Sequence, residues 1–409
     1  MKNLILEANR CLMCKKAKCS TNCPISTPIP EVIDLFKAGQ IAKAGEVLFE
    51  NNPLSLVCAI VCPHEDQCKG NCIRGIKSEP INFCEIEKHI SRYYLENITL
   101  EREELKKERI AIIGGGPAGM TIAFILGQKG YRTTIFDAND KIGGVLRYGI
   151  PEFRLPKSII DSYEDRLIEI GVNIRPNTLI GPVITIDRLL EDGYDAIFIG
   201  TGVWNPKTLD IKGETFGHVH YAIDYLKNPD SYRLGEVVTV IGAGDVAMDA
   251  ARTAKRKGAK KVYVMYRKGI ENMPATKAEI NGAIEDGVEF ELFKSPVEFT
   301  DEGIKYMETE NSIDENGKII TINKDVEEKL FETDSIIIAV SQSPKNNIVN
   351  NTKGIETNKW GLIVTDDRGN TTREGVFATG DVVTGARTVV QATAHAKIVA
   401  EEIERYLNK

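Results

Sequence analysis

Several features are absent from this sequence of 409 residues, and each absence excludes a class of protein. No apolar run approaches the length that crosses a bilayer, and residues 1–10 lack the apolar stretch of a secretory signal. No block of Lys or Arg accompanies the net charge of −7, which argues against a nucleic-acid partner and against a membrane surface. We therefore expect a cytoplasmic chain. Cysteine is absent after residue 84, so the chemistry that the cysteines serve is confined to one N-terminal module.

What is present suits an ordinary globular protein. Hydrophobic residues make up 42% of the chain and charged residues 27%, and the length allows two or three domains with cores of their own. Nine cysteines in a reducing compartment are poor candidates for disulfides. They are better candidates for metal ligands.

Eight of the cysteines form two arrays, each of which contains a Cys-Pro pair. The spacings are Cys11-x2-Cys14-x4-Cys19-x3-Cys23-Pro24 and Cys58-x3-Cys62-Pro63-x4-Cys68-x3-Cys72. In two-cluster ferredoxins the cysteine before proline ligates the other cluster. Applied here, the first iron–sulfur cluster is held by Cys11, Cys14, Cys19 and Cys72, and the second by Cys23, Cys62 and Cys68. Cys58 is left over as a packing residue. Zinc is the rival interpretation, because zinc sites also use C-x2-C pairs.

The rest of the N-terminal module, residues 1–107, reads as helical. Apolar residues recur at helical spacing over Ile29–Asn51, and residues 92–108 are highly charged, as in a solvated helical linker. We expect a mainly α-helical iron–sulfur domain.

The stretch 109–137 has the pattern of a dinucleotide site. An apolar β-branched strand, Arg109–Ile113, is followed by G-x-G-x-x-G, an apolar helix pattern over Met120–Gly127 and a second strand, Arg132–Phe136. Glycines let the backbone approach a pyrophosphate at the helix N-terminus. Asp137, 23 residues beyond Gly114, is placed to accept from ribose hydroxyls.

The pattern repeats from Val237. The strand Val237–Ile241 leads into a second glycine loop and an alanine-rich helix, and the next strand, Lys261–Met265, ends in Arg267 and Lys268 in place of an acid. An acid would repel a 2′-phosphate, whereas a guanidinium and an ammonium bind one. The second site therefore favours NADP(H) over NAD. The alternative is an incidental basic turn.

After a last strand of this unit, Thr333–Val340, the chain returns to the first unit. It does so through Glu374–Asp381 and a helix over Thr388–Tyr406 whose N-terminal dipole is placed to face a flavin. We predict an α/β chain of two nested, doubly wound Rossmann-like domains. Residues 108–226 and 341–409 form a discontinuous FAD-binding domain, and residues 227–340 form an inserted NADP-binding domain.

The predicted cofactor-binding residues lie at the carboxyl ends of strands and in the loop Ile142–Lys157. They are Gly114, Gly116, Pro117, Ala118, Gly119, Asp137, Gly144, Arg154, Thr201, Gly202, Gly242, Gly244, Asp245, Val246, Arg267, Lys268, Gly380, Asp381, Thr388 and Val389.

With these motifs placed, the chain resembles the glutamate synthase small (β) subunit family over essentially its whole length. The motifs are RCLMC, the two Cys-Pro arrays, GGGPAG, GIPEFRLP, GAGDVAMDAA, YRKGIENMPA and ATGDVV. The family includes the amino-terminal half of dihydropyrimidine dehydrogenase with its small bacterial counterpart, and the large subunit of ferredoxin:NADP transhydrogenase.

The resemblance implies FAD, NADPH and two 4Fe-4S clusters, with the crossed ligand assignment. It also implies a non-cysteine fourth ligand for the second cluster, for which Glu87 is the matching position, although Cys84 lies three residues earlier. The family more often has Glu where this chain has Asp137, which shortens the reach of the carboxylate.

The simplest reaction is hydride transfer from NADPH to flavin, followed by single electrons into the clusters. No cysteine is free to act as a glutaminase nucleophile, and the modules leave no room for an FMN-binding barrel of about 250 residues. We therefore expect an electron-supplying subunit in a hetero-oligomer with a larger catalytic subunit, first of all a glutamate synthase large subunit. The alternatives are a pyrimidine-reducing subunit, a ferredoxin, or a structural adaptor with vestigial nucleotide sites.

Overall fold

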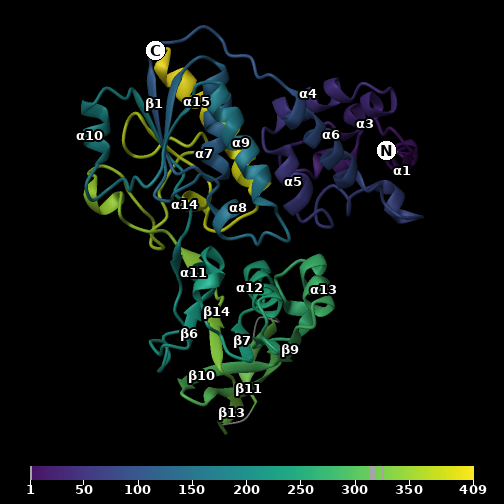
Figure 1. Cartoon of the computed structure of the whole chain (residues 1–409), viewed down its shortest axis with the longest axis vertical. Coiled ribbons are helices and arrows are strands. Elements are labelled where there is room, and N and C mark those ends of the chain that lie inside the picture. The colour runs from purple at the N-terminus through teal and green to yellow at the C-terminus, as the bar shows by residue number, and fades with distance from the viewer. Residues whose placement is uncertain (1, 314–318, 325–326) are drawn as a thin grey trace. The chain divides into compact units, whose positions relative to one another are not determined.

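The protein is described by a computed structural model that covers residues 2–313, 319–324 and 327–409 (Figure 1). The chain divides into two compact units. The first runs from the N-terminus to Arg147 and continues through Glu152–Val203 and Pro344–Lys409. The second comprises Tyr148–Pro151 and Trp204–Ser343.

The N-terminal part of the first unit is helical, and its loops carry the cysteines. Its elements are α1 (Lys2–Asn9), α2 (Lys18–Thr21), α3 (Ile29–Lys37), α4 (Ile41–Asn51), α5 (Ser55–Val61), a 3₁₀ turn η1 (Ile73–Ile76) and α6 (Phe83–Asn97). Helices α3, α4 and α6 bury their apolar faces against one another. Their side chains account for most of this core, as expected of amphipathic helices.

Two helical predictions need correction here. The stretch expected as one helix over Ile29–Asn51 is two helices, because the chain turns at Gly39, whose φ of +75° suits glycine. The helix expected over 92–108 ends at Asn97. Beyond it the backbone pairs with the turn after the next helix, since the N–H groups of Glu103 and Lys106 donate to the carbonyls of Gln128 and Gly130.

The remainder of the first unit is a parallel sheet with helices packed on it. The strands are β1 (Arg109–Ile113), β2 (Arg132–Phe136), β3 (Asn173–Arg175), β4 (Ala196–Ile199) and β16 (Val376–Ala378), in the order β16-β4-β1-β2-β3. The helices are α7 (Pro117–Gln128), α8 (Val145–Tyr148), α9 (Lys157–Glu169), α10 (Ile186–Glu191), α14 (Asp381–Thr384) and α15 (Val389–Leu407), with a 3₁₀ turn η4 (Val349–Asn351). β1 and β4 are apolar and almost fully buried, as central parallel strands are. Helix α15 packs on α7 and also contacts α5 of the cysteine-bearing part (Figure 1).

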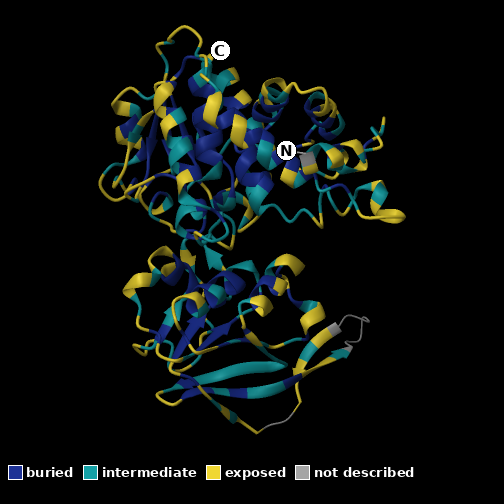
Figure 2. Ribbon diagram, turned by 45° about the vertical axis from the view of Figure 1, so that its right-hand side comes forward, coloured by how far each residue is buried: buried dark blue, intermediate teal, exposed yellow. Residues whose placement is uncertain are grey.

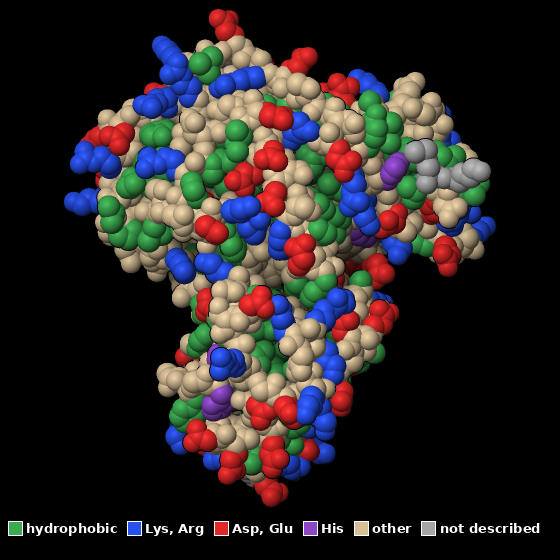
Figure 3. Space-filling view, in the orientation of Figure 1, with side chains coloured by type: hydrophobic (Ala, Val, Ile, Leu, Met, Phe, Trp, Pro, Cys, Tyr) green, Lys and Arg blue, Asp and Glu red, His purple; other side chains and the backbone are tan. Residues whose placement is uncertain are grey.

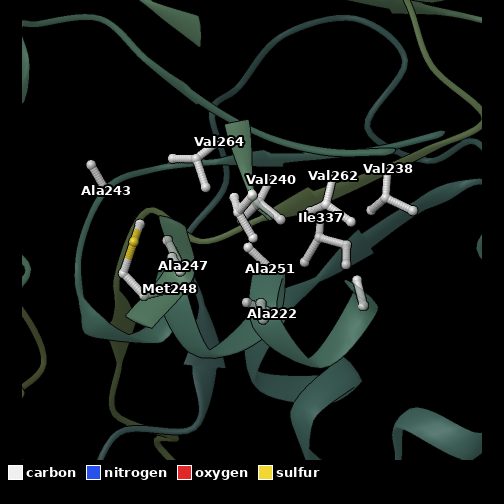
Figure 4. Close-up of a cluster of buried hydrophobic side chains, with 14 of the residues drawn as sticks. Ala222, Val238, Val240, Ala243, Ala247, Met248, Ala251, Val262, Val264 and Ile337 are labelled. Carbon is white, nitrogen blue, oxygen red and sulfur yellow. The ribbon is translucent and has the colours of Figure 1, made fainter. Parts of the chain in front are cut away.

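The second unit repeats the architecture. Its parallel sheet has the order β6-β14-β7-β8-β9. The strands are β6 (Val219–Tyr221), β7 (Val237–Ile241), β8 (Lys261–Tyr266), β9 (Glu289–Leu292) and β14 (Ser335–Ile338). The helices are α11 (Ala222–Lys227), α12 (Asp245–Arg256) and α13 (Lys277–Glu285), with 3₁₀ turns η2 (Pro229–Ser231) and η3 (Ile270–Asn272). Small residues of α12, among them Ala247 and Ala251, let the helix pack closely on Val240 of β7 and Val264 of β8 (Figure 4). The prediction of an α/β chain with two nested doubly wound domains after a helical domain is confirmed.

Two features of the second unit differ from the sequence-based expectation. Its main segment begins at Trp204, earlier than the expected residue 227, because β6 pairs with β14 and so belongs to this sheet. It also carries an antiparallel sheet that was not predicted, built from β10 (Lys294–Thr300), β11 (Gly303–Ile313), β12 (Ile319–Asn323) and β13 (Lys329–Glu332). A short ribbon of β5 (Asn205–Pro206) and β15 (Gln342–Ser343) lies where the chain enters and leaves the unit.

The distribution of side chains is that of a well-packed globular protein. Buried residues concentrate in the parallel sheets and on the inward faces of their helices (Figure 2). On the face drawn in Figure 3, Lys and Arg are interspersed with Asp and Glu. None of the helices formed by the described residues has the length and apolar character needed to cross a membrane.

Candidate cofactor sites

The first glycine loop joins β1 to α7, and its glycines are required by close backbone approach. Gly114 has φ of +98°, and a Cβ there would stand 2.6 Å from the carbonyl oxygen of Gly200. A Cβ on Gly119 would stand 2.0 Å from the carbonyl oxygen of Gly114. Gly116, the residue before α7, differs from both, because the nearest atom to its Cβ would be 3.9 Å away. The side-chain position of Gly116 is therefore open, which suits a loop that receives a phosphate group.

Other predicted residues of this site gather around the loop. The turn that holds Thr201 lies against Gly114, and Gly144 lies against Gly116, where a Cβ on Gly144 would meet the Gly116 Cα at 2.8 Å. Gly144 has φ of +53°, so its backbone also favours glycine. Pro117 and Ala118 open α7, and Gly202 follows Thr201. Arg154 lies in the irregular segment between α8 and α9.

Asp137 follows β2 and is buried beside the loop. Its Oδ2 accepts from the Gly115 N–H at 2.8 Å, and its Oδ1 accepts from the Asn139 N–H at 2.8 Å. The carboxylate therefore fixes the glycine loop. Oδ1 also accepts from Asn139 Nδ2 at 3.0 Å, so the acceptor site left for a ribose hydroxyl is the second one on Oδ2.

The chain's return to the first unit brings a third turn to the same place. A Cβ on Gly380, which has φ of +78°, would lie 3.4 Å from the Ala118 Cβ at the start of α7. Asp381 accepts from the Arg387 N–H at 3.1 Å, and burial raises its pKa to about 6. Thr388 caps α15 with Gln391, so that Val389 is the first residue of the helix. The starts of α7 and α15 thus meet around Gly380.

The second glycine loop joins β7 to α12. As in the first loop, one glycine is required by close backbone approach and another has an open side-chain position. Gly242 has φ of +127°, and a Cβ on it would stand 2.4 Å from the carbonyl oxygen of Ala339. Gly244 is open, with its nearest neighbour, Pro274 Cγ, 4.0 Å from where a Cβ would be. Asp245 accepts from the Thr276 N–H at 2.9 Å, so its carboxylate is hydrogen-bonded within the protein. The half-buried Val246 follows it in α12.

Arg267 and Lys268 follow β8, the strand next to β7 in the sheet. Arg267 is exposed and Lys268 half-buried. Neither side chain makes a hydrogen bond or ion pair with any described residue. Two uncompensated positive charges beside the glycine loop fit the 2′-phosphate of NADP.

Cysteines of both arrays lie together around one cavity. Cys11, Cys14, Cys19 and Cys72, which the sequence assigned to the first cluster, line it together with Cys68, and its other walls are mostly apolar. Burial raises the pKa of Cys11 and of Cys19, and the neighbouring Cys72 raises both further. Leu12 and Ile73 line the same cavity and are 56% and 37% exposed, so this group lies near the surface.

The second group is more deeply buried. Cys62 and Cys68 both have raised pKa values, Cys62 through hydrogen bonding to Cys58 and burial, and Cys68 through burial. Glu87 on α6 acts on both thiols electrostatically, and Cys23 acts on Cys68. In the described residues no three His, Cys, Asp or Glu side chains converge closely enough to share a single metal ion.

Glu87 and Cys84 differ in what they contact. Glu87 is 7% exposed and makes no hydrogen bond or ion pair with a described residue. Burial raises its pKa well above the ordinary value, with a further contribution from Cys58. Buried carboxylates are normally paired or bound to metal. Cys84, by contrast, donates to Asn82 Oδ1 at 2.8 Å, and burial raises its pKa to about 11.

The second thiol group lies against the start of α15. Cys23 and Cys62 pack in one apolar cluster with Val389 and Val390, together with the buried Cys58. Val389, which the sequence assigned to the flavin, is therefore a neighbour of Cys23 and Cys62, which it assigned to the second cluster. Sequence reasoning missed three polar residues in this region, Thr27, Asn51 and Lys397, because no motif marks them.

Comparisons with known proteins show the families to which the two parts of the chain are similar. Residues 108–396 match the family described as pyridine nucleotide-disulphide oxidoreductase, and residues 1–99 match the family described as dihydropyrimidine dehydrogenase domain II, 4Fe-4S cluster. The glutamate synthase [NADPH] small chain of Halomonas elongata is 34% identical, over 98% of this chain and 90% of the relative.

A second relative belongs to a different complex, and a solved structure shows the fold. The NADP(+)-dependent formate dehydrogenase subunit beta of Moorella thermoacetica is 32% identical, over 96% of this chain and 60% of that protein. The structure of FprA from Mycobacterium tuberculosis in complex with NADPH matches with a TM-score of 0.62 and 17% identity, over 74% of this chain and 85% of that one. The chain therefore belongs to the pyridine nucleotide-disulphide oxidoreductase family and, with its 4Fe-4S domain, to the NADPH-dependent FAD and iron–sulfur oxidoreductases that include the glutamate synthase small chains.

Proposed function

We propose that this chain is the electron-input subunit of a larger enzyme and passes electrons from NADPH through FAD and two 4Fe-4S clusters to a partner subunit. The contact of Cys23 and Cys62 with Val389 and Val390 carries the proposal. It puts ligands of one cluster beside the helix that begins at the flavin site. The first thiol group, near exposed Leu12, is then the exit to the partner.

The cofactors supply the redox chemistry, namely hydride transfer from NADPH to the flavin and one-electron transfer to iron, and the protein holds them. The open Gly116 and the N-terminal N–H groups of α7 receive the pyrophosphate of FAD, and Asp137 accepts from its ribose. Gly380, Asp381 and the N-terminus of α15 hold the ribityl and ring region. The positive end of α15 stabilises negative charge there.

NADPH is held by the second unit in the same way. The open Gly244 and the N-terminus of α12 receive its pyrophosphate, while Arg267 and Lys268 bind the 2′-phosphate.

The clusters take their ligands from both arrays. Cys11, Cys14, Cys19 and Cys72 hold the first cluster, and Cys23, Cys62, Cys68 and Glu87 hold the second. Glu87 is favoured over Cys84 because it is buried without another partner, whereas the Cys84 thiol is engaged by Asn82. Anaerobically purified protein should accordingly carry about eight irons per chain.

Paired cysteine variants test the order of transfer. In Cys62→Ala, which lacks the second cluster, NADPH should still bleach the flavin, while the first cluster stays oxidised in frozen samples examined by electron paramagnetic resonance. In Cys72→Ala the flavin and the second cluster should both be reduced. If the first cluster of Cys62→Ala is reduced as fast as in the unmodified protein, the proposed order is wrong. Loss of the same cluster in both variants contradicts the crossed ligand assignment.

The partner we propose first is a glutamate synthase large subunit, on the strength of the small-chain relatives. The isolated chain should reduce artificial acceptors with NADPH but form no glutamate from glutamine and 2-oxoglutarate until that subunit is added. The formate dehydrogenase relative favours a second class of partner, a dehydrogenase subunit of another complex. A pyrimidine-reducing subunit and a ferredoxin are further candidates. Identifying the protein that co-purifies with the chain decides between them, and glutamate formation by the purified chain alone would refute the proposal.

A further inference from the structure

A line of polar side chains connects α15 to Cys23 through the helical domain. Lys397 on α15 reaches the end of α4, where its Nζ lies 2.6 Å from the Asn51 carbonyl oxygen and 3.3 Å from Asn51 Oδ1. Asn51 Nδ2 lies 3.4 Å from Thr27 Oγ1, which in turn lies 3.3 Å from Cys23 Sγ. Thr27 is 3% exposed, so its hydroxyl has little access to water.

The chemistry of these groups sets the direction of every hydrogen bond. An ammonium group has donors only, so the side chain of Asn51 must turn its Oδ1 to Lys397 and its NH₂ group to Thr27. Thr27 Oγ1 then accepts from Asn51, and its single hydrogen is free to donate to Cys23. A thiolate ligand has no hydrogen, so Thr27 is the donor whenever Cys23 binds iron. All three bonds point their positive ends at the sulfur.

We propose that Lys397, Asn51 and Thr27 form a hydrogen-bond relay that raises the reduction potential of the second cluster through Cys23. Hydrogen bonds to the ligand sulfurs help to set the potential of iron–sulfur clusters, and such donors favour the more negative, reduced state. The bonds polarise one another in the apolar surroundings that Ile25, Cys58 and Val390 provide. The three residues position and tune the cluster and do not touch a reacting atom. The inference rests on the proposed role of Cys23 as a ligand.

The relay also couples the potential to domain contact. Lys397 belongs to the helix that starts at the flavin site, whereas Thr27 and Asn51 belong to the cysteine-bearing helical domain. The cluster is therefore tuned as an electron acceptor only while that domain is seated on α15.

Redox titration of the anaerobically purified holoprotein, followed by electron paramagnetic resonance, tests the relay. Thr27→Val removes the hydroxyl at nearly constant volume and should make the midpoint potential of the second cluster more negative. Asn51→Leu and Lys397→Met should shift it in the same direction by decreasing amounts, and Thr27→Ser should restore the original value. The first cluster is the internal control and should keep its potential in every variant.

A matched threonine controls for general effects on the array. Thr21 donates to the Lys18 carbonyl oxygen at 3.2 Å, is exposed, and is not part of the relay, so Thr21→Val should shift neither cluster. A Thr27→Val potential equal to that of the unmodified protein would overturn the relay, as would a shift of both clusters together. If Thr27→Val fails to assemble the cluster, unshifted potentials in both Asn51→Leu and Lys397→Met overturn it. Retention of both clusters in Cys23→Ala would instead show that the proposed ligand set is wrong.

Discussion

Alanine at the open glycine of each loop should separate cofactor binding from folding. Gly116 (φ −76°, ψ −172°) and Gly244 (φ −87°, ψ 176°) have extended backbones that alanine adopts without strain. The nearest atoms to a new Cβ are 3.9 Å and 4.0 Å away. Gly→Ala at a compatible position stabilises by about 0.4–1 kcal/mol through the unfolded state, and alanine is worse than glycine as an N-cap by a similar amount. The free energy of unfolding of the cofactor-free protein should therefore change by less than about 0.5 kcal/mol.

Cofactor binding should respond quite differently, because the methyl group stands where the pyrophosphate must approach the backbone. Losing one charge-assisted contact to an N–H group costs about 1.5–3 kcal/mol. Gly244→Ala should accordingly raise the KM for NADPH by roughly tenfold or more, measured anaerobically with an artificial acceptor. Gly116→Ala should yield protein depleted of FAD.

Gly242→Ala is the contrasting variant. Its φ of +127° is nearly restricted to glycine, and its Cβ would meet the Ala339 carbonyl oxygen at 2.4 Å. We expect its free energy of unfolding to fall by about 2 kcal/mol or more, as thermal unfolding would report. The reasoning is refuted if Gly244→Ala leaves the KM unchanged, or if it destabilises the protein as much as Gly242→Ala does.

Three further predictions concern charge, burial and packing. Replacing Arg267 with a neutral residue should raise the KM for NADPH, by up to the roughly 1.5–3 kcal/mol of a charge-assisted contact, while that for NADH stays nearly constant; equal losses with both coenzymes would assign the residue a structural role. Because burial raises the pKa of Asp381 from 3.8 to about 6, its stabilising contribution is present below pH 4 and is lost as the pH rises through 6. Asp381→Asn should therefore raise the unfolding temperature of the FAD-free protein at pH 8 more than at pH 5, and an equal effect at both would contradict the assignment. Gly45→Ala should destabilise the helical domain by about 1–3 kcal/mol, since its Cβ would stand 2.5 Å from Tyr94 Cβ where α4 crosses α6; unchanged thermal unfolding would show that the two helices can separate freely.

Several strands of the parallel sheets were predictable because they are short runs of mainly β-branched residues beside the glycine loops. β1, β2 and β7 have the bounds that the sequence indicated, since their buried positions hold apolar residues and threonine. The antiparallel sheet could not be predicted from the sequence, for the opposite reason. β10, Lys294–Thr300, has only one fully buried residue, so it shows neither a continuous apolar run nor a clear alternation.

The helical domain shows where periodicity is ambiguous. Apolar residues of α3 and α4 follow one another at helical spacing, and only the positive φ of Gly39 divides them. An isolated glycine within a helical pattern is compatible with continuation or with a break, and the sequence does not choose. The charged stretch after Asn97 has helix-forming residues, but backbone pairing with the α7–β2 turn takes precedence there.

The candidate site likewise has residues that the sequence predicts and residues that it does not. The chemistry of the cofactors demands fixed residue types at fixed spacing, so glycine loops and Cys-Pro arrays are visible in one dimension. The side chains that would surround the cofactors do not recur at any fixed spacing in the sequence. Lys397 and Asn51 are 346 residues apart in the chain, and Thr27 reaches Cys23 only because the loop after α2 folds back on it.

The proposed crossing of the two arrays would couple the folding of the two cysteine loops. In the proposed ligand sets, Cys23 and Cys72 each belong to the cluster to which the other array contributes most, so neither set is complete until both loops have folded. Metal binding supplies folding free energy when the site does not exist in the unfolded chain. The two clusters should therefore stabilise the helical domain jointly. Cys23 and Cys62 pack against Val389 and Val390 of α15, so under the proposed function cluster assembly and the path for electrons from the flavin depend on the same packing contact.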